Sequence, residues 1–344
     1  MKSHNTKSHV KLNYEIFKFL NPSANTKIST LKGMDLQELL ILLDEMYLYL
    51  RKKLNFDKDV TFGLEIEFEH SNISKVKKQL NNTIKNNTWS CAYDDSLFEG
   101  VEIVSPILRN TEKTWNELEK VCEVAKNNGK ISDNSGAHIH VGAQIFQADI
   151  DSFFNFLKMY SVYENVINRF FYGEFLNPRP SLLKYAKPIS NELYSFYKKN
   201  RRTKRIKDLL VKISRSRSNA ISFFDITSLY KLEKDNTIEF RTPNGTLEPV
   251  IWQNNVNLCI NILKHSNSNI FNDDIVERRR HINLRNDSSL NLYNEIYLEQ
   301  ALELCDLIFD NNLDKIYFLR QYLKSFEMPK EEFQKAKKFV LNIE

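Results

Sequence analysis

Apolar and polar residues alternate without a break through residues 60–70, VTFGLEIEFEH. Period-two alternation predicts a half-buried strand with Val60, Phe62, Leu64, Ile66 and Phe68 on its apolar face. The opposite face carries Thr61, Gly63, Glu65, Glu67 and Glu69. Glutamate is depleted in strands, and like charges on one sheet face repel. We therefore expect a cation beside this face, either basic side chains or a metal, unless the face is exposed to solvent.

Three later segments follow the same design, each with an aliphatic face and a charged or imidazole-bearing face. They are GVEIVSP at 100–106, SGAHIHVG at 135–142 and TIEFRTP at 237–243. Their polar faces carry, in order, Glu102, then His138 and His140, then Glu239 and Arg241. Trp89, Cys91 and Tyr93 predict a further strand that ends in a turn at Asp94 and Asp95. Residues 221–230 predict the first arm of a hairpin whose turn falls at 234–236. Together these segments predict an antiparallel sheet.

The rest of the chain shows mostly helical spacing. We expect helices at residues 35–53 with Asp35 as cap, 72–88, 111–128 with Thr111 as cap, 149–171, 249–264, 293–309 and 313–326. Residues 1 to about 30 lack periodicity and are expected to form a loose arm. The predicted fold class is α+β, a curved antiparallel sheet with helices packed on its outer face. We expect an arm and helix at 1–58, a sheet domain at 59–265 and a helical extension at 266–344 packed on it.

The composition and net charge limit the classes of protein to which this chain can belong. With 344 residues and 42% hydrophobic content, the chain can build a full core. The net charge of +5 suits an anionic small molecule but does not by itself imply nucleic acid. Four scattered cysteines without a CxxC pair are typical of reduced thiols. No signal-peptide pattern and no membrane-length apolar run is visible, so we expect a soluble, cytoplasmic protein.

If the four polar faces converge, one side of the sheet holds several carboxylates, two imidazoles and a guanidinium. Burying so many carboxylates without a cation would be very costly. Carboxylate-rich sets favour Mg²⁺, with Mn²⁺ as an alternative, over Zn²⁺. Because protein-bound Mg²⁺ usually also contacts substrate phosphates, a nucleotide triphosphate is the expected ligand, with His140 and Arg241 as phosphate contacts. No GxxxxGK[ST] loop is present, so the chain is not a P-loop enzyme.

Four motifs carry a family resemblance: FGLEIEFE, YDDSLFEGVEIVSP, SGAHIHVG and TIEFRTPNGTLEP. In this order they resemble the motifs of the putative amidoligase family, which is similar to glutamine synthetase and glutamate–cysteine ligase. The match covers roughly residues 60–265. The resemblance implies a glutamine-synthetase-like sheet that binds ATP with two or three Mg²⁺ ions. It implies an ADP-forming ligase that joins a carboxylate to an amine, as an amide or isopeptide, through an acyl phosphate.

The resemblance also implies roles for individual residues. As metal ligands it implies Glu65, Glu67, Glu102, His138 and Glu239. As ATP contacts it implies His138, His140, Arg241 and, on a looser match, Arg169. As catalytic residues it implies Glu67, Asp94 and Arg241. Asp94 and Ser96 match a D-G-S motif near the substrate, but Asp95 replaces its glycine.

Two other functions remain open. A metal-dependent hydrolase or oxygenase on a cupin-like barrel would use the two histidines and a glutamate, but the glutamate expected soon after them is missing from VGAQIF. A nucleic-acid-binding protein or nuclease would use the ten basic residues between Lys198 and Arg217. Under the favoured interpretation the partners are a small-molecule or peptide carboxylate and an amine. Neither nucleic acid nor a membrane is then expected, and the oligomeric state is not predicted.

Overall fold

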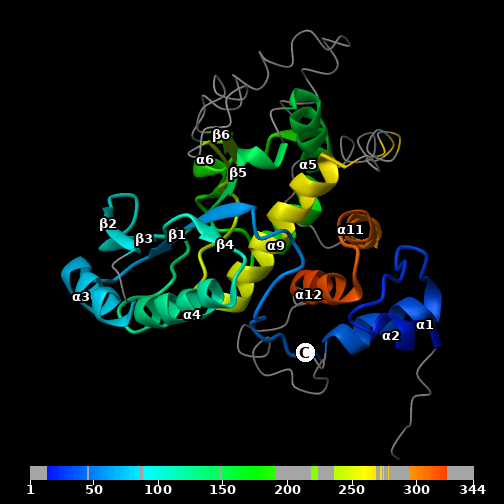
Figure 1. Cartoon of the computed structure of the whole chain (residues 1–344), viewed down its shortest axis with the longest axis horizontal. Helices are drawn as coiled ribbons and strands as arrows, with labels where there is room; N and C mark the ends of the chain where they lie inside the picture. The colour runs from blue at the N-terminus through cyan, green and yellow to red at the C-terminus, as the bar shows by residue number, and fades with distance from the viewer. Residues whose placement is uncertain are drawn as a thin grey trace, which may run out of the picture.

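A computed structural model describes residues 14–44, 46–84, 88–146, 149–190, 218–223, 236–268 and 295–323, together with residues 272, 274 and 278. Its centre is an antiparallel sheet of seven described strands in the order β2-β3-β1-β5-β7-β6, with β4 paired to β1 (Figure 1). The strands are β1 Thr61–Phe68, β2 Ser90–Asp94, β3 Gly100–Val104, β4 Leu108–Arg109, β5 Ala137–Gly142, β6 Ile221–Phe223 and β7 Thr237–Phe240.

The register of these strands brings the predicted polar positions together. Glu67 lies opposite Glu102 on β3, and Glu65 lies opposite His138 on β5. On the other edge of β5, His140 lies opposite Glu239 of β7. The alternating residues point to the other face and are buried, as at Ile66, Ile103 and Ile139, each with 0% exposure. The predicted division of the sheet into an apolar and a polar face is confirmed.

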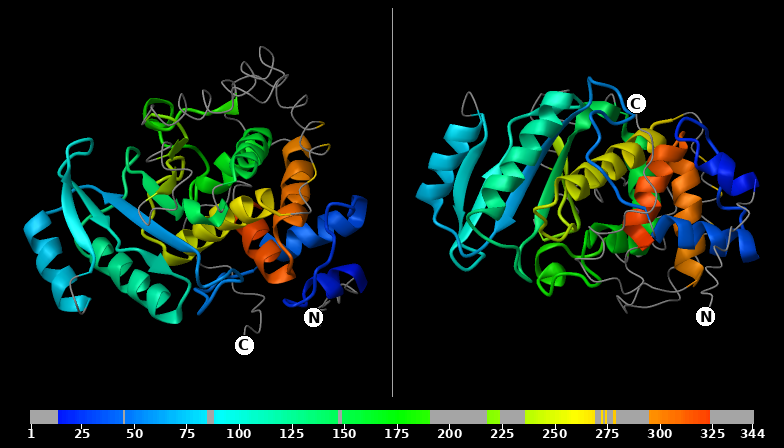
Figure 2. Two further views of the ribbon diagram at one scale, coloured as in Figure 1. Left: turned by 45° about the horizontal axis from the view of Figure 1, so that its top comes forward. Right: turned by 90° about the horizontal axis from the view of Figure 1, so that it is seen from below.

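Four helices cover the apolar face: α3 Ile73–Thr83, α4 Glu112–Lys126, α5 Ile150–Phe171 and α9 Pro249–Ser266. Figure 2 shows α3, α4 and α9 along one side of the sheet. Thr111 caps α4 by accepting the Thr114 N–H at 3.2 Å, and Asp149 caps α5 through the N–H groups of Asp151 and Ser152. The sheet in the described ranges ends at β2 and β6 and does not close. This contradicts the closed, cupin-like barrel.

The two ends of the described chain pack together. The N-terminal helices α1 Tyr14–Phe19 and α2 Gly33–Asp44 lie beside α11 Glu295–Ile308 and α12 Asn312–Leu323 (Figure 1). The Asn312 side chain donates to the carbonyls of Lys18 and Asn21, which fixes the segment after α1. Ile16, Phe19 and Ile28 are buried, so the expectation of a loose arm is wrong from residue 14 onward. The helices predicted at 249–264 and 293–309 are present, and α12 covers most of that at 313–326.

The helix predicted at 35–53 is also wrong in its length, because α2 ends at Asp44. Beyond residue 46 the chain bonds to side chains from distant elements. The Arg51 N–H donates to Gln253 Oε1 at 2.8 Å, and the Leu54 N–H donates to Asn110 Oδ1 at 2.9 Å. These side-chain acceptors replace the carbonyls that a continuing helix would supply.

Several expectations depend on parts of the chain outside these ranges. The basic run 198–217 and the hairpin turn at 234–236 fall largely or wholly outside the described residues. The division into three regions stays a prediction. All four cysteines are buried with free thiols. Among the described helices, none combines the length and apolar character that crossing a bilayer requires.

Candidate active site

A cavity of about 340 Å³ opens over the polar face of the sheet. Its lining comes from β1, β2, β3 and β5, from the turn after β2, from the segments around Asn134 and 179–185, and from Arg241 directly after β7. The lining residues are Glu65, Glu67, Tyr93, Asp94, Asp95, Ser96, Glu102, Asn134, His138, Arg179, Tyr185 and Arg241. Six of the residues predicted from the sequence therefore share one cavity, and Ser96 lies with them.

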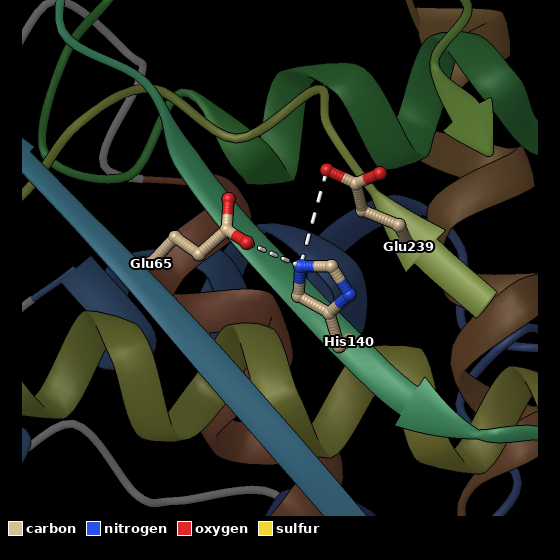
Figure 3. A group of neighbouring side chains, drawn as sticks. All are labelled: Glu65, His140 and Glu239. Carbon is tan, nitrogen blue, oxygen red and sulfur yellow. Dashed lines mark hydrogen bonds and ion pairs between the residues drawn. The ribbon is translucent and has the colours of Figure 1, made fainter. Parts of the chain in front are cut away.

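Glu65 is the centre of the charged network. Its Oε2 lies 2.7 Å from His138 Nδ1, and its Oε1 lies 2.9 Å from His140 Nε2. Figure 3 shows Glu65, His140 and Glu239 reaching toward one another from three neighbouring strands, with the imidazole between the carboxylates. Burial alone would raise the pKa of the Glu65 carboxyl, but hydrogen bonds and positive charge from both histidines lower it well below its usual range.

Two sets of three side chains could each hold a metal ion. One set is Glu65, His140 and Glu239, and the other is Glu65, Glu102 and His138. Within each set, the ligand atoms all lie within 4.8 Å of one another. Glu65 belongs to both sets, so two ions bound there would share it as a bridging ligand. His140, predicted only as a nucleotide contact, joins the candidate metal ligands.

The carboxylates of Glu67 and Glu102 also line the cavity and add negative charge to it. Glu67 is in neither metal set; its Oε1 lies 3.4 Å from His138 Nε2, and its Oε2 accepts the Gly136 N–H at 2.6 Å. The pKa of the Glu102 carboxyl is raised to about 7 by burial and by the neighbouring charges of Glu65 and Glu67. The pKa of His138 is raised above its ordinary value, because the Glu67 charge and the Glu65 hydrogen bond outweigh the effect of burial. Both directions agree with the crowding of carboxylates on this face of the sheet.

Arg241 supplies one guanidinium to this face. Its Nη1 pairs with Glu239 Oε1, and its Nε lies 3.4 Å from the Tyr185 carbonyl oxygen. The side chain is 17% exposed, at the cavity wall. A guanidinium has five N–H donors in a planar fork, so donors remain for an anionic ligand.

The other two predicted residues differ in their placement. Asp94 lines the cavity at the end of β2, where its Oδ1 accepts the Ser96 N–H at 2.8 Å. Arg169 is 4% exposed on α5, and its guanidinium lies over the Tyr322 ring of α12 at 5.6 Å. Arg169 is absent from the lining of the cavity, so we give it no part in the site.

Arg179 was not predicted. It is 5% exposed, and its guanidinium donates to the carbonyls of Pro243 and of Arg241, the latter at 2.8 Å. Burial lowers the pKa of Arg179 to about 10, although the Glu67 charge opposes this. A Cβ added at Gly136 would lie 3.0 Å from Glu67 Oε2 and 3.1 Å from Arg179 Nη1, so the glycine permits their close approach. Arg179 is the one arginine between Tyr172 and Ser190, and no motif or periodicity in that segment marks it as a site residue.

The comparison with known families agrees with this arrangement. The family model described as "Putative amidoligase enzyme" matches residues 15–263, which include every described strand and every residue that lines the cavity. A search of curated proteins found no match. Because the matched region covers more than half of the chain, we conclude that the protein belongs to the putative amidoligase family.

Proposed function

We propose that the protein is an ATP- and Mg²⁺-dependent ligase that joins a carboxylate to an amine through an acyl phosphate, releasing ADP. Membership of an amidoligase family supports a ligase. The observation that carries the finer proposal is the convergence of Glu65, Glu102 and Glu239 with two histidines and Arg241 on one sheet face.

The donor set fits divalent cations of the magnesium type. Two guanidinium groups and two imidazoles face six carboxylates, so the site stays negative even when both histidines are charged. The carboxylates are those of Glu65, Glu67, Asp94, Asp95, Glu102 and Glu239. Octahedral Mg²⁺ ligands at roughly 2.1 Å from the ion are about 3–4 Å apart, comparable with the spread within each candidate set. Bound there, Mg²⁺ would screen the phosphate charge of ATP and orient its γ-phosphate.

The remaining groups suit phosphoryl transfer to a carboxylate. Arg241 pairs with Glu239 and lines the cavity, where its remaining donors would stabilise the negative charge that develops on the transferring phosphoryl oxygens. Arg179 adds a second positive charge beside Glu67. A carboxylate and a triphosphate repel each other, and these two guanidinium groups would reduce that repulsion in the cavity.

The reaction then has two steps. A carboxylate oxygen of the substrate attacks the γ-phosphorus, the bond to the β-phosphate oxygen breaks, and ADP leaves with its electron pair. The amine nitrogen then attacks the acyl carbon, inorganic phosphate leaves and the amide forms. The acyl phosphate must be kept from water between the steps, because water would hydrolyse it.

The first test is ADP release by the purified protein with Mg²⁺, ATP and pools of amino acids and peptides. We expect release that depends on the added substrates and falls at least about 100-fold in Glu67→Ala, which leaves His138 and Arg179 without their shared carboxylate. Glu112→Ala, at an exposed position on α4, should behave like the wild type. Salt-sensitive nucleic-acid binding without any ATP turnover would instead favour the nucleic-acid function and overturn the proposal.

A second prediction concerns the stability of the protein with and without Mg²⁺. Mg²⁺ must displace the protons held by Glu102 and His138, so it should raise Tm more at about pH 8 than at about pH 5.5. The sign follows from both raised pKa values. Without metal, the stabilising effect of each bound proton is present at low pH and is lost as the pH rises, through about 7 for Glu102.

Thermal unfolding followed by circular dichroism measures this difference. We expect the Mg²⁺-induced rise in Tm to be larger at the higher pH by at least about 3 °C, since 1 kcal/mol moves Tm by roughly 2–4 °C in large domains. Glu102→Gln removes one of the two titrating groups and should reduce the pH dependence. An equal rise at both pH values, or none, would show that Mg²⁺ does not occupy these carboxylates.

A further inference from the structure

A second cavity of about 320 Å³ adjoins the active site. It lies between the segments 131–135 and 174–180, and residues Asn244 and Gly245 complete its wall. Arg179 lines both cavities, and consecutive residues of one segment alternate between them: Asn134 lines the active site, while Asp133 and Ser135 line the second cavity. A ligand bound in the second cavity would therefore have one end close to the active site.

The second cavity is held by hydrogen bonds from distant segments. The Arg179 N–H donates to Asn244 Oδ1 at 2.9 Å, and Asn244 Nδ2 donates to the Asn177 carbonyl at 2.9 Å. The Gly245 N–H donates to the Ser135 carbonyl at 2.8 Å. A Cβ at Gly245 would lie only 2.7 Å from that of Ser135. The cavity is thus formed before any ligand arrives, as small-molecule sites usually are.

Its walls combine carboxylates with apolar surface. Glu174 is 3% exposed and accepts a hydrogen bond from Thr246 Oγ1 at 3.0 Å, and Asp133 lies on the opposite segment. Phe175, Leu176 and Pro178 supply apolar atoms. Carboxylates with apolar neighbours suit an ammonium group on an alkyl stem. The volume is about ten times the roughly 30 Å³ that one water takes in the liquid, so the cavity is far larger than ammonia requires.

We propose that this second cavity binds the amine substrate of the ligase, and that this substrate is a primary alkylamine rather than ammonia. The inference rests on the proposed function and adds the class of its second substrate. The amine nitrogen passes Arg179 to attack the acyl carbon, and phosphate leaves with the electron pair of the broken bond. Of the two protons that an ammonium nitrogen loses overall, one leaves on phosphate and the other goes to solvent.

The test places a larger side chain in the second cavity and leaves every active-site residue unchanged. Leu176 is 38% exposed on the cavity wall, so Leu176→Trp can be accommodated by the fold while it occupies part of the space. Leu183→Trp is the matched control, because Leu183 is 55% exposed on helix α6 (Leu182–Tyr185) and lines neither cavity. The probes are n-butylamine, Nα-acetyl-lysine, ammonia and hydroxylamine, which is small enough to reach the acyl phosphate without the cavity.

With the wild type we expect kcat/KM at least about 10-fold higher for n-butylamine or Nα-acetyl-lysine than for ammonia. Leu176→Trp should lower kcat/KM for n-butylamine and Nα-acetyl-lysine at least about 10-fold. The rate of hydroxamate formation from hydroxylamine and the KM values for ATP and for the carboxylate should stay within about twofold of the wild type. Binding of n-butylamine, measured by calorimetry without turnover, should weaken by a similar factor.

Other results would overturn the inference. Preference for ammonia, or equal losses with hydroxylamine and alkylamine, would show that the cavity does not hold the amine. If Leu176→Trp raised only the KM for the carboxylate, the second cavity would bind the carboxylate substrate and not the amine. If the wild type formed neither ADP nor hydroxamate, the proposed function itself would be contradicted, and with it the inference about the amine.

Discussion

Glu65→Gln should reduce kcat/KM for substrate-dependent ADP release at least about 1000-fold, the largest effect of any single substitution. Glu65 is the one side chain that both candidate metal sets share, and it contacts both histidines. Glutamine keeps the shape but removes the negative charge, so each set loses its shared anionic ligand and His138 loses its closest carboxylate partner. The Mg²⁺-induced rise in Tm should disappear with the activity.

Glu69→Gln is a close control for this substitution. Glu69 is the next residue but one after Glu67, 5% exposed, and its Oε1 accepts the Phe98 N–H at 3.2 Å. A glutamine oxygen can accept the same hydrogen bond, and Glu69 belongs to neither metal set. Activity within about threefold of the wild type is expected for the control. Retention of most activity in Glu65→Gln would contradict the assignment of the shared ligand.

Arg241→Lys should lower kcat by about 100-fold or more while changing the KM for ATP little. Lysine keeps the positive charge, so Glu239 remains paired and the sheet face stays neutralised to the same degree. The planar fork is lost, however, and with it the fixed donors aimed at the phosphoryl oxygens. Steady-state kinetics with ATP varied at saturating substrate separates the two parameters.

Arg109→Lys serves as the comparison for Arg241→Lys. Arg109 is on β4, where its Nη1 donates to the carbonyls of Lys58 and Asp59 at 3.1 Å, and it lines neither the active site nor the second cavity. This variant should retain wild-type kcat. If Arg241→Lys raised the KM for ATP and left kcat unchanged, Arg241 would bind the ground state only, and its role in phosphoryl transfer would be wrong.

The sheet and its polar face were predictable because they depend on local periodicity. Alternation fixes which side chains share a face, and pairing of neighbouring strands then aligns the faces. Hence the pattern predicts that Glu67 and Glu102 share a face. The register that places Glu67 opposite Glu102 and Glu65 opposite His138 required the structure. The Thr111 cap was equally predictable, since the hydrogen bond that it accepts is local. The cap predicted at Asp35 is wrong, because α2 begins at Gly33 and Asp35 lies inside its first turn.

What the sequence could not predict depends on contacts between distant segments. The end of α2 at Asp44 reflects acceptors on Gln253 and Asn110, far along the chain. The position of Arg179 depends on carbonyls of residues 241–243, and its own segment has no periodicity. Glu69 shares the polar face with Glu65 in the sequence pattern, yet it binds a backbone N–H and joins neither metal set. Alternation assigns a face but does not distinguish a ligand from a structural hydrogen-bond acceptor.

The most direct measurement follows the oxygen atoms of the carboxylate. The purified enzyme would be incubated with Mg²⁺, ATP, the amine and the substrate pool labelled with ¹⁸O in its carboxylates. Attack of a carboxylate oxygen on the γ-phosphorus predicts that inorganic phosphate carries one ¹⁸O for each ADP released, detectable by mass spectrometry. Unlabelled phosphate, or release of AMP in place of ADP, would contradict the acyl-phosphate ligase.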